Sequence, residues 1–236
     1  MEELTIICLE AMWDHTYKSG NGWRPQSSVQ PYILAHSTLW GFNLIYRQIR
    51  TEADFIAWTK ATQSAHLKTR LIWISGHGEN CDDEYVVMMP RYNWERSETR
   101  LRPKCIRDGL SFAGQNLGGV IVDSCSFGNN KPNSWISDND QWALAYSKDV
   151  DWTCSVMYDL LCLEWIYSNG YPRTSQDAAS CYRRGLQTGG EWKKKDRIDL
   201  SSLAEALGAN FYYRKSGGGL RKIWVQGGKP IDEKAL

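Results

Sequence analysis

The sequence predicts an α/β fold built on a mostly parallel sheet with helices on both of its faces. Two short runs, 71–74 and 120–122, are apolar at every position and stop abruptly at small and polar residues. Continuous apolar runs are typical of strands buried on both faces of a parallel sheet. Predicted strands also alternate with predicted helices along the chain, which is the pattern of parallel strands joined by helical crossovers.

Local signals define the elements that precede the second apolar run. Pro31 suits the first turn of a helix, and Gly41 suits the position just past its end. Thr51 and Asp54 resemble a capping box at the start of the next helix. The predicted elements are a strand at 4–9, a helix at 32–40, a strand at 43–50, a helix at 51–61, a strand at 70–75, a hairpin or excursion over the rim at 79–103 and a helix at 105–116.

The second half of the chain is more polar, and its elements are assigned from composition and from helix-ending glycines. The stretch 129–149 is rich in Asn, Asp, Ser and Lys. This composition predicts a mobile loop, enclosing a short helix at 141–146. The remaining predicted elements are a fifth strand at 151–156, helices at 157–169, 175–186 and 200–207, and a terminal hairpin formed by 210–215 and 222–226.

Length and composition restrict the class of protein. A chain of 236 residues can bury one sizeable core, and we expect a single domain over 1–236. The net charge of +1 gives no global reason to expect nucleic acid or a membrane surface as a partner. Seven cysteines without Cys-x-x-Cys spacing argue against a disulfide framework and a zinc ribbon. With no basic leader and no membrane-spanning apolar run, we expect a cytoplasmic protein.

The candidate site lies where the two apolar runs end. His77 and Cys125 come shortly after them, and the carboxyl ends of parallel strands meet at one edge of a sheet. An imidazole and a thiol at the same edge are the components of a nucleophilic Cys-His site. Gly78 lacks a side chain, so its N–H could face a reacting carbonyl together with the N–H of Cys125. Two such donors would form an oxyanion hole.

These residues carry a resemblance to a known family. The segments Ser75-Gly76-His77-Gly78 and Asp123-Ser124-Cys125-x-x-Gly128 resemble the caspase-type (clan CD) cysteine peptidases, especially the metacaspases and the bacterial caspase-like CHAT proteins. A weaker likeness extends over 4–226 and includes the helix beginning near Gln176. The resemblance implies a caspase-like three-layer fold with a six-stranded sheet, five strands parallel and the last antiparallel.

The resemblance also implies roles for individual residues. His77 becomes the general base or acid, Cys125 the nucleophile and Gly78 an oxyanion donor. Asp123 becomes a wall of the pocket that receives the residue before the cleaved bond. Asp151 and Asp159 are candidates for a second acidic pocket residue. Metacaspases usually carry His-Ser after the cysteine, whereas this chain has Ser126-Phe127.

The sequence therefore predicts a cysteine endopeptidase that acts on a protein substrate, without a cofactor or metal. A carboxylate at Asp123 favours cleavage after a basic residue, because Lys or Arg could pair with it. The resemblance suggests a bacterial stress or anti-phage response as the setting, with a regulatory protein as a further partner. The alternative is a catalytically inactive caspase-like binding or scaffold module. A third, more remote reading is a nucleic-acid-binding domain that uses the basic stretch 183–197.

Other candidate sites have fewer of the residues that their chemistry needs. Cys8 with His15, and His77 with Cys81, each supply only two ligands or partners. His36 and His66 fall within or beside predicted helices. The glycines at 217–219 lack the following Lys-Ser/Thr and helix of a phosphate loop.

Overall fold

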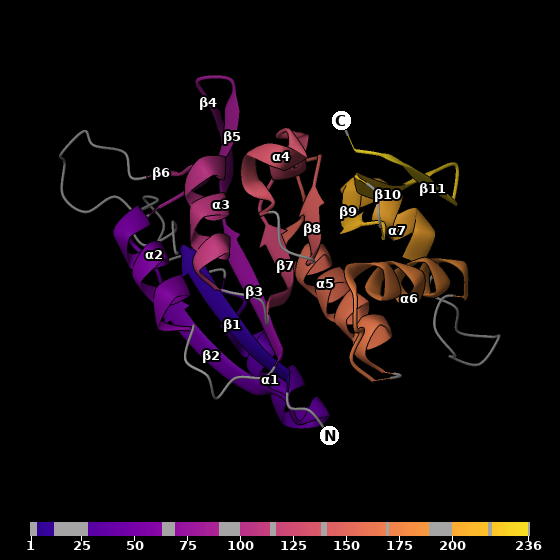
Figure 1. Ribbon diagram of the computed structural model, residues 1–236, viewed down its shortest axis with the longest axis horizontal. Coiled ribbons are helices and arrows are strands. Elements are labelled where there is room, and N and C mark those ends of the chain that lie inside the picture. Colours follow the sequence, from indigo (N-terminus) through magenta and orange to yellow (C-terminus); the bar gives the residue numbers. More distant parts are fainter. Residues whose placement is uncertain are drawn as a thin grey trace, which may run out of the picture.

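The computed structural model describes residues 4–11, 28–62, 69–89, 100–113, 117–137, 141–168, 170–188, 200–216 and 219–235. Its centre is an eight-stranded sheet with the strand order β11-β10-β9-β8-β7-β3-β1-β2 (Figure 1). The strands of this sheet are β1 (Leu4–Ala11), β2 (Asn43–Gln48), β3 (Thr69–Gly76), β7 (Leu117–Asp123), β8 (Trp142–Tyr146), β9 (Ala209–Arg214), β10 (Leu220–Gln226) and β11 (Lys229–Lys234).

The five strands from β2 to β8 are parallel, and the last three are antiparallel. All residues of β1 and β8 are buried, as expected for strands covered on both faces. The resemblance to caspase-type peptidases implied five parallel strands and one antiparallel strand, and β9 is that sixth strand. The sheet is larger than predicted, because β10 and β11 extend it beyond β9.

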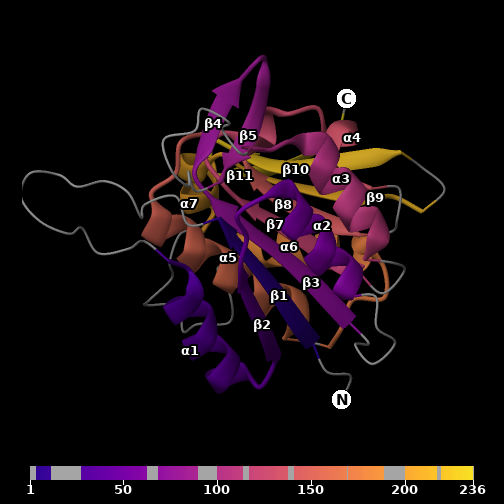
Figure 2. The ribbon, with the colours of Figure 1, turned by 90° about the vertical axis from the view of Figure 1, so that its left-hand side faces the viewer.

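Helices cover both faces and make three layers. The helices are α1 (Gln30–Trp40), α2 (Glu52–Ala61), α3 (Pro103–Phe112), α4 (Pro132–Trp135), α5 (Trp152–Tyr167), α6 (Ser175–Thr188) and α7 (Leu200–Leu207). One apolar core contains side chains of α1, α5, α6 and α7, and a second contains side chains of α2, α3 and α4. Figure 2 shows α1 and α5 on one side of the sheet and α3 on the other. The predicted α/β class, with helices on both faces, is confirmed.

The helix signals in the first half of the chain are confirmed. Pro31 lies in the first turn of α1, and Gly41 ends this helix in the left-handed conformation with φ 70°. At α2 the Thr51 side chain accepts a hydrogen bond from the backbone N–H of Asp54, and the Asp54 carboxylate accepts one from Thr51 N–H. This reciprocal pair is the predicted capping box.

Two assignments between 129 and 156 are wrong. The stretch 142–146, predicted as a helix within a loop, is β8, the fifth parallel strand. Its sequence Trp-Ala-Leu-Ala-Tyr is short and apolar, and tertiary burial decides its conformation. The stretch 151–156, predicted as a strand, begins α5, where the Asp151 carboxylate accepts a hydrogen bond from Cys154 N–H and caps the helix.

The excursion after His77 forms a second, three-stranded sheet. Its strands are β4 (Gly78–Cys81), β5 (Glu84–Met88) and β6 (Arg100–Leu101), in the order β4-β5-β6. The turn between β4 and β5 is made by Asp82 and Asp83, both with positive φ. This hairpin projects past the edge of the large sheet (Figure 1). Asn130 belongs to the segment 124–130 after β7, which contains Cys125 and is called the nucleophile segment below. Its side chain donates a hydrogen bond to Tyr85 O and accepts one from Tyr85 N–H, so these bonds hold the hairpin to the nucleophile segment.

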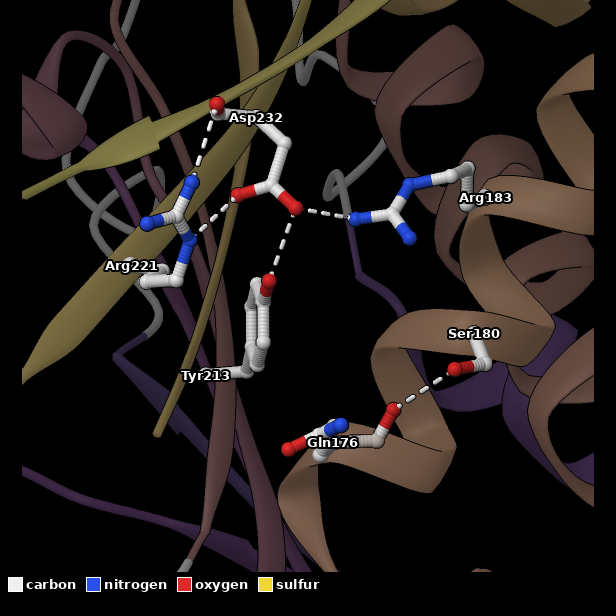
Figure 3. A network of polar contacts seen from close by, with 6 residues as sticks. All are labelled: Gln176, Ser180, Arg183, Tyr213, Arg221 and Asp232. Carbon is white, nitrogen blue, oxygen red and sulfur yellow. Dashed lines mark hydrogen bonds and ion pairs between the residues drawn. The ribbon is translucent and has the colours of Figure 1, made fainter. Parts of the chain in front are cut away.

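The carboxyl-terminal strands are held to α6 through Asp232. Its carboxylate accepts hydrogen bonds from Arg183 of α6, from Arg221 Nε at 2.8 Å and from the Tyr213 hydroxyl at 2.8 Å (Figure 3). Charge-assisted hydrogen bonds of this kind are stronger than neutral ones. The contacts stabilise the edge strand β11 against β10 and α6. Among the described residues, no helix is long and apolar enough to span a membrane.

Candidate active site

The structure brings His77 and Cys125 to the same edge of the large sheet. They follow β3 and β7, which are neighbouring parallel strands, and Ser75 pairs with Asp123 in the register of these strands. Each of the two residues lies two positions beyond that pair. Both are half-buried at the carboxyl end of the sheet, where ligands of open α/β sheets bind.

The backbone after His77 is packed directly against Cys125. A Cβ atom placed on Gly78 would lie 2.1 Å from the carbonyl oxygen of Cys125 and 2.8 Å from its nitrogen. Real Cβ atoms do not approach backbone this closely, so only glycine fits at this position. The two segments whose N–H groups we expect to form an oxyanion hole are therefore in contact.

The Cys125 thiol contacts the segment that follows β8. Val150 N–H donates a hydrogen bond to Sγ at 3.4 Å, and Sγ lies 3.9 Å from the carbonyl oxygen of Val150. Burial raises the pKa of Cys125, and the carboxylates of Asp149 and Asp123 raise it further, whereas the hydrogen bond from Val150 lowers it. These effects favour the protonated thiol over the thiolate.

Ser126 directs the chain away from the nucleophile. It has a φ of 57°, in the left-handed region that few residues other than glycine adopt. Its N–H donates to Lys148 O at 2.9 Å, and its hydroxyl donates to Asp149 Oδ1 at 3.0 Å. The sequence analysis assigns 141–146 to a helix, so it does not predict that residues 148–150 contact Cys125 and Ser126. The polar sequence Ser-Lys-Asp-Val-Asp after a buried run, once β8 is recognised, is the signal for a strand end at the site.

Asp123 lies beneath the site in a buried polar layer. Glu10, Ser75 and Asp123 occupy paired positions on β1, β3 and β7 and all are buried. Asp123 is 0% exposed, and among the described residues neither carboxylate oxygen has a hydrogen-bond partner of good geometry. Burial raises the pKa of Asp123 to about 7; the hydroxyls of Ser155 and Ser75 lower it, and Glu10 raises it.

Asp159, one of the two candidates for a second pocket acid, belongs to the same layer. It is buried in α5, and burial together with the charge of Asp123 raises its pKa well above the ordinary value. The Tyr146 hydroxyl is hydrogen-bonded to Asp159 and lies 3.4 Å from Ser155 O. The single proton of the Tyr146 hydroxyl cannot be donated to Asp159 and to Ser155 O at once. If Asp159 is protonated, it donates to the Tyr146 oxygen, and the Tyr146 proton is left for Ser155 O. Asp151, the other candidate, is exposed and caps α5.

Glu10, in contrast, is fully engaged by its neighbours. Its carboxylate accepts hydrogen bonds from Ser28 Oγ at 2.8 Å, from Val29 N–H at 2.9 Å and from the Tyr46 hydroxyl. Buried carboxylates require such partners. Among the described residues, neither oxygen of Asp123 has a hydrogen bond of good geometry, and Oδ2 of Asp159 also lacks one. The hydroxyls of Ser155 and Ser75 are the groups that interact with the Asp123 carboxyl.

The fold is similar to that of solved peptidase structures. A secreted C11 cysteine protease from Bacteroides thetaiotaomicron, in complex with an irreversible peptide inhibitor, is 10% identical over 91% of this chain, with a TM-score of 0.48. The Drosophila initiator caspase Dronc is 13% identical over 83% of this chain and 80% of its own, with a TM-score of 0.47. The present chain spans 66% of the C11 protease. No protein-family model matches the chain, and no curated protein matches it.

The competing sites do not assemble in the described residues. Cys8 is buried in β1, where burial raises its pKa well above the ordinary value, and its proposed partner His15 lies outside the described residues. Cys81 ends β4, and no group of three or more His, Cys, Asp or Glu within the described ranges could hold a metal ion. His36 stacks on Trp40. His66 and residues 189–197 of the basic stretch also lie outside the described residues.

Proposed function

We propose that the chain is a cysteine endopeptidase that uses His77 and Cys125. One observation carries the proposal: the two residues follow paired positions of adjacent parallel strands, and the Gly78 backbone abuts the Cys125 backbone. An imidazole, a thiol and two neighbouring backbone N–H groups are what acyl transfer from a peptide bond requires.

In the proposed reaction, His77 takes the thiol proton and the Cys125 sulfur attacks the carbonyl carbon of the substrate. The N–H groups of Gly78 and Cys125 stabilise the negative oxygen of the tetrahedral intermediate. His77 then gives the proton to the leaving amine, and an acyl-enzyme thioester remains. Water, deprotonated by His77, hydrolyses the thioester and regenerates the thiol. Because burial and Asp149 favour the protonated thiol, Cys125 depends on this base.

We further propose cleavage after a basic residue. Asp123 precedes Cys125 by two residues, and its buried carboxylate lacks a hydrogen-bond donor of good geometry among the described residues. A substrate Arg could supply two N–H donors and a positive charge, which would offset the cost of burying the ionised carboxylate. An acidic substrate residue would bring neither donors nor a positive charge and could not offset this cost.

The setting remains a proposal that depends on the resemblance to bacterial caspase-like CHAT proteins. We propose a cytoplasmic enzyme that acts in a stress or anti-phage response and is controlled by a regulatory protein. Deleting the coding sequence from its host, or replacing Cys125 by Ala there, should remove the response. Unchanged phage and stress sensitivity of both strains would refute this setting.

A catalytically silent binding module is the second candidate, and one observation favours it. The Sγ atom of Cys125 is held by Val150, and its pKa is raised. A fluorogenic peptide panel that varies only the residue before the cleaved bond separates the two functions. A peptidase with the proposed preference cleaves Arg and Lys peptides and loses this activity in Cys125→Ala. Absence of turnover across the panel, with no preferential alkylation of Cys125, would support the silent module.

A further inference from the structure

A cavity of about 510 Å³ lies next to the nucleophile segment. Its walls are residues 128–132, Ser147 just after β8, parts of β9, β10 and β11, and Ala235 just after β11. Tyr212, which lines it, packs in the core formed with α2, α3 and α4. The cavity therefore lies on the face of the sheet opposite the face that Asp123 occupies with α5. Its volume is in the range of pockets that bind small molecules, so it has room for a single substrate side chain.

Positive charge predominates in the lining of this cavity. Three lysines line it, Lys131, Lys222 and Lys234, together with one carboxylate, Glu233. The Lys222 ammonium lies 3.1 Å from Glu233 Oε1 and 5.5 Å from the centre of the Trp224 ring. These two contacts hold Lys222 in place, which reduces the entropy lost when it binds an anion. Lys131 and Lys234 are exposed and leave an excess of positive charge.

The wall of the cavity begins at Gly128, three residues after Cys125. Gly128 and Asn129 line it, and three residues of backbone span at most about 10 Å. Asn129 Nδ2 donates to Ser147 O at 2.9 Å, so the wall and the nucleophile segment are held together. An extended peptide advances about 3.3 Å per residue. A side chain two to four positions from the cleaved bond could therefore enter the cavity.

We propose that this cavity binds an acidic residue of the protein substrate, two to four positions from the cleaved bond. The proposal rests on the peptidase function. A Glu or Asp carboxylate complements the excess of lysine charge, and its extension from a backbone held near Cys125 fits the position of the cavity. The substrate class is then a protein segment that combines a basic residue at the cleaved bond with a nearby acidic residue.

A binding experiment tests this proposal without requiring turnover. The Cys125→Ala protein is titrated with fluorescently labelled peptides that carry Arg before the scissile position and a single Glu two, three or four positions from the cleaved bond, on either side. Matched peptides carry Gln instead of Glu. We expect at least one Glu peptide to bind about three- to fivefold more tightly than its Gln partner at low salt, and this preference to disappear in Lys131→Glu/Lys234→Glu. Both lysines are exposed, so their replacement leaves the core intact.

Matched variants distinguish the cavity from a general charge effect. Lys104→Glu/Lys229→Glu makes the same change in net charge at exposed residues that do not line the cavity, and should keep the preference. Lys222→Gln should weaken binding of the Glu peptide and leave the Gln peptide unchanged. Equal binding of all Glu and Gln peptides would overturn the proposal, as would binding of inorganic phosphate or ATP in the cavity without any preference for Glu peptides. Failure of the peptidase function appears separately, as absence of cleavage by the unmodified protein.

Discussion

The buried carboxyl of Asp123 should make the stability of the fold depend on pH. A pKa raised from 3.8 to about 7 means that the folded protein holds this proton more tightly than the unfolded chain does. Each tenfold change in proton affinity is worth about 1.36 kcal/mol, so ionising Asp123 in the folded state costs roughly 4 kcal/mol. Asp123→Asn keeps the shape and removes the titration. The folded pKa is the higher one, so the wild type loses stability relative to the variant as pH rises from about 4 to 7.

The assay is urea unfolding of the wild type and Asp123→Asn at half-unit steps between pH 4 and 8. The difference between their unfolding free energies should change by about 1.4 kcal/mol per pH unit up to about pH 7 and then level off. Other groups titrate in both proteins, and taking the difference removes most of their contribution. Parallel stability curves from pH 4 to 8 would show that Asp123 is ionised normally in the fold and refute the buried-acid argument.

Four further substitutions test the geometry around the nucleophile and the assigned burial of the cysteines. Gly78→Ala should cost about 1–3 kcal/mol and abolish peptide cleavage, because its Cβ would collide with the Cys125 carbonyl; full activity in a kinetic assay would refute this contact. Asp149→Asn should lower the pKa of Cys125 and increase its alkylation rate about two- to threefold at fixed pH and low salt, as followed by mass spectrometry; an unchanged rate would exclude this charge effect. Cys8→Ala should lower the unfolding free energy by about 1–2 kcal/mol and leave cleavage intact. Cys125→Ala should abolish cleavage and leave the unfolding free energy nearly unchanged. A stable Cys8→Ala protein together with an unstable Cys125→Ala protein would contradict the assigned burial.

The sequence predicted the elements whose signals are local. The capping box at Thr51, the helix end at Gly41 and the strands before His77 and Cys125 all depend on a few neighbouring residues. Such signals act within one turn or one strand and survive in any tertiary context. The placement of the two candidate catalytic residues at one edge followed from the parallel strands alone.

Elements that depend on distant contacts were missed. The run 142–146 is too short for periodicity to distinguish a strand from a helix, and it becomes a strand because β7 and β9 pair with both of its edges. The segment that begins with the capping residue Asp151 is likewise too short for periodicity to distinguish a strand from a helix, and the sequence analysis assigns it to a strand. β11, in contrast, follows a local signal that the sequence analysis does not use. It pairs with β10 across Gly227 and Gly228, both with positive φ, which is typical of a two-residue hairpin turn.

The chemistry around the site was also only partly visible in the sequence. Strand alternation placed Asp123 on one face, but its complete burial and the nearby Asp159 depend on how α5 packs. The contact of Val150 with the thiol required the correct end of β8. The catalytic roles of His77, Cys125 and Gly78 remain predictions.

The central claim is that His77 activates Cys125 to attack a peptide carbonyl. Its most direct test uses an irreversible peptide ketone with Arg next to the reactive group, followed by intact-mass and peptide-mapping mass spectrometry. The account predicts one adduct per chain, located on Cys125, which forms at least about a hundredfold more slowly in His77→Ala. Modification spread over several of the seven cysteines, or an equal rate at Cys125 without His77, would contradict the claim.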